Sequence, residues 1–210
     1  MAITSLNNYS VKPGSDVANT GMLMPKLKYR FRVILLGFGV ESSTELTKQV
    51  QDITRPKVSF EEMSLDIYNS KVKLAGRYSW EPITLTLRDD AIGNVTKLVG
   101  QQIQKQFDFM EQASARSGID YKFTTKIEIL DGGNGANNPQ VLDTFELYGC
   151  FLQNTDYGDL AYGTNEHATV ALTIVYDNAI QTAGTTGIGT SVGRQTLSAL
   201  TTGSSQPFNE

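Results

Sequence analysis

The sequence contains one cysteine and one histidine among its 210 residues. A single cysteine, Cys150, excludes an intramolecular disulfide. Its neighbours Leu147, Tyr148 and Phe151 predict a buried, inert thiol rather than a nucleophile. His167 has no nucleophile or paired metal ligand at a recognisable spacing, so we expect an ordinary surface or loop residue. The residue types that catalysis needs are scarce, and we predict no enzyme activity and no cofactor.

Long apolar runs and a positive charge balance are also missing. No run approaches the roughly 18 apolar residues that a membrane-spanning helix needs, and the first residues lack the basic start and apolar core of a secretion signal. Lysine and arginine number 18 against 22 aspartates and glutamates, which gives a net charge of −4. This balance argues against tight binding to nucleic acid, because that affinity depends on cations that replace counterions at phosphates. It does not oppose the passage of nucleic acid past the protein.

The chain is rich in stretches where apolar and polar side chains alternate, as in strands with one face against a core. Hydrophobic residues form 40% of the sequence, enough to build such a core. The alternation is clearest where Val170, Leu172 and Ile174 share one face. We predict strands over residues 28–38, 44–53, 121–130, 141–151 and 168–176.

Residues 71–90 show the same alternation on both sides of Ala75 and Gly76. Glycine favours a tight reversal, so we predict a β-hairpin that turns at this pair and buries one face. Proline cannot donate to a strand ladder, which predicts a bulge near Glu81 and Pro82. The apolar residues assigned to the buried face are Val72, Leu74, Ile83, Leu85 and Leu87.

One amphipathic helix is predicted over about residues 94–116, with Asn94 as its cap and Ser117 and Gly118 as its end. A narrow apolar stripe indicates that it covers a sheet. The order of strands, one helix and further strands predicts a mainly β fold, a β-sandwich or small barrel of antiparallel strands with one flanking α-helix. We assign 1–25 to an N-terminal arm, 26–180 to the β domain and 181–210 to a Gly/Thr/Ser-rich extension. The stripe consists of Val95, Leu98, Val99, Ile103, Phe107 and Met110.

Three polar or glycine-rich stretches admit a ligand as an alternative. Residues 131–140 are expected to form a long turn and lack the acidic spacing of a calcium loop. Asp89 and Asp90 could hold magnesium, but the positive end of the following helix dipole explains two carboxylates at this position. The glycines between 184 and 193 lack the strand and helix of a dinucleotide site, so we assign them to a linker.

The segment around the predicted hairpin resembles the tail tube proteins of contractile-tailed bacteriophages, which are related to the type VI secretion tube protein. In that family a lysine, apolar residues, an Ala-Gly pair, a tryptophan, an alternating strand and an acidic residue precede a helix. The resemblance covers roughly residues 28–177. The positions that match are Lys73, Ala75, Gly76, Trp80, Leu85, Leu87 and Asp90.

The resemblance implies a β-sandwich or barrel with a flanking helix and hexameric rings that stack into a hollow tube inside a contractile sheath. Such a tube guides DNA into the host and belongs to the virion, after assembly in the host cytoplasm. The implied partners are other copies of the chain, the tail sheath protein, the tape measure protein, and the baseplate and tail terminator proteins. DNA would pass without specific binding, and we expect a net acidic lumen.

Within this hypothesis we expect residues 61–77 to form a contact between stacked rings. The basic residues of this segment would meet acidic residues of a neighbour, and a solvated charged hairpin is the alternative. Ring closure would also pair strand edges that are otherwise exposed. The candidate contact residues are Glu61, Glu62, Asp66, Lys71, Lys73, Arg77 and Trp80.

Two alternatives to a phage tube stay open. The chain could be the tube subunit of a tail-derived bacteriocin or of a contractile injection system. It could also be a receptor- or carbohydrate-binding β-sandwich at a virion tip, for which Tyr157 and Tyr162 would supply exposed aromatic rings.

Overall fold

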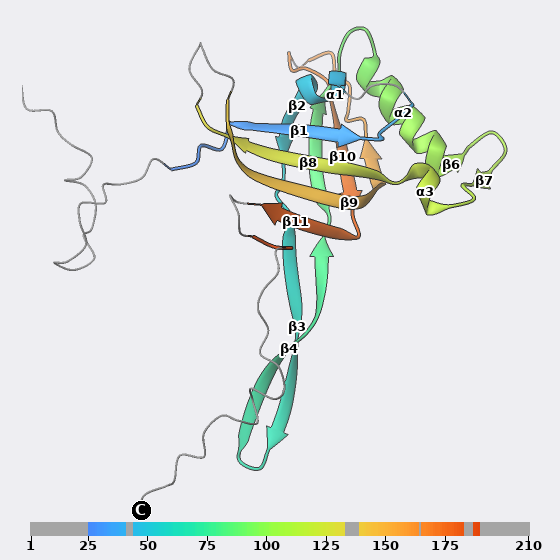
Figure 1. Ribbon diagram of the computed structural model, residues 1–210. Coiled ribbons are helices and arrows are strands. Elements are labelled where there is room, and N and C mark those ends of the chain that lie inside the picture. The colour runs from blue at the N-terminus through green and yellow to red at the C-terminus, as the bar shows by residue number, and fades with distance from the viewer. Residues whose placement is uncertain (1–24, 41–43, 133–138, 164, 183–186, 190–210) are drawn as a thin grey trace, which may run out of the picture.

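The computed structural model describes residues 25–40, 44–132, 139–163, 165–182 and 187–189, and these ranges contain eleven strands and three helices. Every strand pair within them is antiparallel. The mainly β class predicted from the sequence is confirmed, and one long helix lies beside the sheets (Figure 1). No helix in the described ranges is long and apolar enough to cross a membrane.

Seven strands form one bent sheet in the order β1-β8-β9-β10-β5-β2, with β11 paired to β9 as well. The strands β1, β8, β9 and β11 run across the direction of β10, β5 and β2, so the sheet folds over itself (Figure 1). Both halves share β9. The bounds are β1 Phe31–Leu36, β2 Val50–Ile53, β5 Ile83–Arg88, β8 Phe123–Leu130, β9 Val141–Asp156, β10 Thr169–Val175 and β11 Asn178–Thr182.

The corner of the bent sheet lies in the middle of β9. Up to Tyr148 this strand pairs with β11, and from Phe151 onward it pairs with β10. Gly149 lies between the two pairings with φ of 68°, a conformation that glycine adopts without strain. The turn from β10 to β11 passes directly over it, where the Asp177 backbone N–H donates to the Tyr148 carbonyl oxygen at 3.0 Å.

The core lies between the two halves of the sheet. The alternation predicted for 121–130, 141–151 and 168–176 is confirmed, since one set of side chains on each strand is buried. Cys150 is also fully buried, as predicted, and burial raises the pKa of its thiol. The fully enclosed core residues include Val33, Leu35, Leu85, Ile127, Leu147, Leu172 and Ile174.

The long helix α2 spans Asn94–Gln106 and is shorter than predicted. Asn94 is its first residue rather than its cap. The carboxylates of Asp89 and Asp90 stabilise the first turn of the helix. Asp89 accepts a hydrogen bond from the Thr96 hydroxyl at 3.1 Å, and Asp90 accepts one from the Val95 N–H at 3.2 Å. This placement agrees with the dipole explanation of the acidic pair.

The predicted continuation of this helix to residue 116 is wrong. The chain becomes extended after Gln106, and strands β6 (Phe107–Asp108) and β7 (Ala113–Ser114) form a small hairpin before helix α3 (Gly118–Tyr121). The Asp108 carboxylate accepts hydrogen bonds from two backbone N–H groups of the turn, which stabilises the reversal. Met110 is therefore 94% exposed although it continues the apolar stripe.

The strand predicted over 44–53 is only half correct. Its first part is helix α1 (Thr44–Gln49), and only β2 is extended. Leu46 is fully buried, because α1 packs against β1 and α2. A sequence this short carries too few periods to separate helix from strand.

The predicted hairpin over 71–90 is also wrong. β3 (Lys57–Ile67) pairs with β4 (Ser70–Glu81), the chain reverses at Tyr68 and Asn69, and Ala75 and Gly76 lie inside β4. The bulge predicted near Glu81 and Pro82 is wrong too, because β4 ends at Glu81, Pro82 separates it from β5, and the register shift of the hairpin lies near Gly76. The hairpin projects from the body (Figure 1), and in the single chain neither of its faces is buried.

The predicted arm lies outside the described residues up to residue 24, as does the extension over 183–186 and 190–210. Within 187–189 the Ile188 carbonyl accepts a hydrogen bond from the Gln181 N–H at 2.9 Å.

Candidate assembly interface

The projecting β3–β4 hairpin carries a register shift near its middle. Phe60 lies opposite Tyr78, but Glu62 lies opposite Ala75, so β4 holds one more residue than β3 across this step. The extra residue forms a β-bulge of Gly76 and Arg77 opposite Glu61. Beyond a bulge the side chains of the bulged strand change faces, whereas those of the partner strand keep their alternation.

The apolar side of the hairpin changes face along its length, because the β3 sequence shifts its phase between Phe60 and Met63 and the bulge shifts β4 to match. Near the body, apolar residues lie on one face, which we call the root patch. Beyond Gly76 they lie on the opposite face, which we call the tip patch. The root patch consists of Val58, Phe60, Tyr78 and Trp80, and the tip patch of Met63, Leu65, Ile67, Val72 and Leu74.

Both patches are open to solvent in the single chain. Phe60 is 61% exposed in the root patch, and Ile67 is 54% exposed in the tip patch. Scattered exposed apolar residues are normal on a protein surface, but a contiguous set on a projecting element marks an interaction site. The hairpin therefore offers two apolar surfaces that face in opposite directions.

The contact residues predicted from the sequence lie on this hairpin, mostly opposite the tip patch. Lys73 is 3.0 Å from Glu62, and Lys71 is 3.4 Å from Asp66. The basic and acidic residues thus already pair within one chain. All four are well exposed, so each pair contributes little to stability.

The other three predicted residues lie at the bulge and at the root. Glu61 and Arg77 lie on opposite strands at the bulge, and Trp80 is partly buried. The Trp80 ring lies 5.7 Å from the Tyr176 ring, centroid to centroid, and 6.4 Å from the Tyr78 ring. Trp80 therefore ties the hairpin to the core.

The charged residues of the hairpin were predicted as contact residues from the sequence, but the two apolar patches were not. A signal was present, because Phe60 and Met63 break the period of two at the adjacent acids Glu61 and Glu62. A phase break inside a strand predicts either a bulge or a change of face. Only the pairing with β4 identifies which of these occurs.

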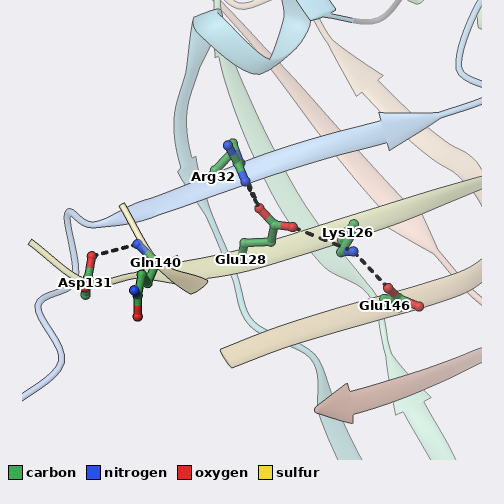
Figure 2. Close-up of polar contacts among 6 residues, drawn as sticks. All are labelled: Arg32, Lys126, Glu128, Asp131, Gln140 and Glu146. Atoms are coloured by element: carbon green, nitrogen blue, oxygen red, sulfur yellow. Dashed lines mark hydrogen bonds and ion pairs between the residues drawn. The ribbon is translucent and has the colours of Figure 1, made fainter. Parts of the chain in front are cut away.

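A row of charged side chains crosses strands β1, β8 and β9 (Figure 2). Arg32 on β1 donates to the Glu128 carboxylate on β8 at 2.5 and 2.7 Å. Lys126 lies between Glu128, at 3.7 Å, and Glu146 on β9, at 3.2 Å. Four charges of alternating sign thus form a ladder across three strands.

At the β9 end of this ladder the Tyr148 hydroxyl donates to Glu146 at 2.5 Å. This hydrogen bond, with a further contribution from Lys126, lowers the pKa of Glu146, and it raises the pKa of Tyr148. The ladder thus keeps Glu146 ionised. The acidic lumen expected from the sequence stays a prediction.

The remaining candidate sites have structural roles. His167 lies 3.1 Å from the Gln51 side chain on an exposed surface. The Asp131 carboxylate accepts from the Gln140 N–H at 2.8 Å and closes the base of the 131–140 turn (Figure 2). Residues 133–138 of this turn lie outside the described residues. Elsewhere in the described chain, no group of three or more metal-ligating side chains occurs.

No family model matches the sequence, and no curated protein matches it either. Solved structures do match. A chain in the six-fold symmetrised baseplate of the anti-feeding prophage aligns with a TM-score of 0.57 at 15% identity, over 77% of this chain and 98% of that chain. A chain in the tube-terminating cap of the same prophage aligns with a TM-score of 0.57 at 17% identity, over 81% and 97%.

A chain in the sheath-tube complex of an extracellular contractile injection system aligns with a TM-score of 0.54 at 16% identity, over 76% of this chain and 93% of that chain. The alignments span nearly the whole of the matched chains. The tail tube fold implied by the sequence resemblance is thereby confirmed.

Proposed function

We propose that this protein is a structural subunit whose copies form hexameric rings that stack into the inner tube of a contractile phage tail, the conduit for DNA ejection. The tube of a tail-derived bacteriocin or of a contractile injection system is the alternative, and the fold supports either equally. In both cases the role is structural and not enzymatic.

One observation carries the proposal: the hairpin exposes apolar patches on both of its faces. Covering an exposed Leu, Met or Phe side chain completely contributes up to about 1.5–3 kcal/mol. A hairpin with apolar patches on two opposite faces can bury both of them when it lies between two neighbouring subunits, as in stacked rings. The long β3–β4 edges could also pair between copies.

The proposed partners are supported by the matched structures and by the net charge of the chain. Baseplate, sheath and tube-terminating cap appear in the descriptions of the matched structures, which supports sheath, baseplate and terminator proteins as partners. The six-fold symmetry of the prophage baseplate supports the ring number. A tape measure protein and DNA would occupy the lumen, and the net charge of −4 favours passage over binding.

Removing the apolar patches tests this function. The double variants Met63→Ser with Leu65→Ser and Phe60→Ser with Tyr78→Ser are compared by negative-stain microscopy and sedimentation. We expect rings or tubes from the unaltered protein and folded single chains from both variants. The matched control replaces two apolar residues that are 88% and 89% exposed off the hairpin, Ile119→Ser with Leu160→Ser, and should assemble normally.

The charged face of the hairpin is tested separately. Reversing Lys73 and Arg77 to glutamate should also weaken assembly, but less than loss of a patch, because exposed ion pairs contribute about 0–1 kcal/mol each. Normal tubes from both patch variants would refute the proposed role of the hairpin. A small fixed oligomer from the unaltered protein would favour the receptor-binding alternative.

A further inference from the structure

A cleft lies at the open seam of the sheet, between β1 and β2. It has a volume of about 510 Å³. The apolar side chains of Phe31, Ile53, Ile127 and Ile129 line it, and the last two belong to the core. The cleft is therefore an opening into the apolar interior.

Both strands beside the cleft end the hydrogen-bonded order of the sheet. β1 pairs with β8 on one side, and β2 pairs with β5; within the described ranges neither has a second strand neighbour. A second hollow of about 480 Å³ continues along the same seam toward Thr47 of α1. The seam is a slot between two strand edges, with apolar side chains beneath it.

The rim of the slot is strongly basic. Four of the residues that line the 510 Å³ cleft are cationic, and Asp52 is the one acidic residue that lines it. Lys26 lies 3.3 Å from Asp143, and the Arg30 guanidinium lies 5.4 Å from the Tyr29 ring. The other two cations, Lys28 and Arg55, have no ion-pair partner within the described part of the chain.

We propose that this slot binds an extended acidic segment of another protein as an added β-strand. Backbone groups of the segment would pair with the edge of β1 or β2. Alternate side chains would point inward to the apolar floor, and glutamates or aspartates between them would face Lys28 and Arg55. The proposal goes beyond the tube function and does not depend on ring formation.

The chemistry of the slot favours this occupant over nucleic acid. A phosphate backbone could neutralise the rim but would leave the apolar floor exposed to water. An alternating acidic and apolar strand satisfies the floor, the rim and the strand edge together. Its period of two matches the spacing at which a strand presents one face.

The test measures fluorescence anisotropy of a labelled peptide of about eight residues, in which glutamate alternates with valine. Three comparison probes share its length: a peptide of the same composition in block order, the alternating peptide with N-methylated backbone amides, and an oligothymidylate. The protein variant is Lys28→Glu with Arg55→Glu. The matched control, Arg88→Glu with Arg116→Glu, reverses two exposed cations that do not line the slot.

We expect the alternating peptide to bind the unaltered protein and the control variant equally, and the slot variant at least about tenfold more weakly. Block order and N-methylation should each weaken binding by a similar factor, because the first disrupts the faces and the second removes backbone donors. No binding of the alternating peptide, equal affinity of the slot variant, or tighter binding of the oligothymidylate would overturn the proposal. So would loss of self-association in the slot variant without peptide binding, since the occupant would then be a second copy of this chain.

Discussion

Gly76 on β4 lies against the backbone of Glu61 on β3, and a Cβ atom at position 76 would lie 3.0 Å from the Glu61 carbonyl oxygen. The close approach lets the bulge form, and the bulge brings Val72 and Leu74 of β4 to the same face as Met63 and Leu65 of β3. The geometry at Gly76 thus keeps the apolar residues of the two strands on one common face at the tip.

Replacing Gly76 with valine should distort the bulge, since backbone must move to admit the side chain. We expect assembly to fall sharply while the thermal unfolding of the body stays close to that of the unaltered protein. Negative-stain microscopy and circular dichroism measure the two effects. Ala75→Val is the control, because it places the same valine side chain next to the bulge on an exposed face; equal assembly of the two variants would contradict this prediction.

Gly149 lies at the corner of the sheet with φ of 68°, and a Cβ atom at this position would clash with the Asp177 side chain. Gly149→Ala should lower the free energy of unfolding by about 1–3 kcal/mol, through backbone strain and displacement of Asp177. Urea unfolding measures the change. Gly100→Ala, at a helical position with open space around the added methyl, should instead raise stability by about 0.5–1 kcal/mol.

Glu128 is almost fully buried beneath its ion pair with Arg32. Glu128→Gln should reduce the free energy of unfolding by about 1–3 kcal/mol, because the amide is a poor replacement for the carboxylate. Replacing both partners, Arg32→Met with Glu128→Leu, should restore most of that loss. A double variant less stable than Glu128→Gln, in a urea series that also includes Arg32→Met, would show that the pair contributes more than apolar packing can.

Burial raises the pKa of Tyr176 to about 12, with a smaller opposing contribution from the Lys57 backbone. The folded pKa lies above the unfolded value of 10.0. The buried neutral phenol therefore contributes fully to the free energy of unfolding below pH 10, and this contribution is lost as the pH rises toward 12. Tyr176→Phe lacks this loss. Relative to the unaltered protein, the variant should gain about 1–2 kcal/mol between pH 9 and pH 11.5 in urea unfolding; a constant difference would contradict the buried phenol.

The alternating strands were predictable because their period of two continues over many residues. Val170, Leu172 and Ile174 lie buried where the pattern placed them. The helix end at Gln106 was not predictable from its stripe, because Phe107 and Met110 fit the helical period and leave it through a turn that Asp108 stabilises. Tertiary contacts decide such ends.

The hairpin shows a second limit. Ala75 and Gly76 have the composition of a turn, but the long pairing of β3 with β4 uses Gly76 as a bulge. The candidate residues from Glu61 to Trp80 all lie on the β3–β4 hairpin, although the predicted pairing of the strands was wrong. Their pairing within one chain and the two apolar patches depend on register, which the sequence does not specify by itself.

The most direct test of the account places the photoreactive residue benzoylphenylalanine at position 65, in the tip patch. A mixture of isotopically light and heavy chains is assembled, irradiated and digested, and the crosslinked peptides are identified by mass. We predict mixed light–heavy crosslinks from position 65 to another copy, and none from a probe at the exposed position 119. A protein that stays a single chain at every concentration, or that yields only crosslinks within one copy, would contradict the claim that other copies cover the hairpin.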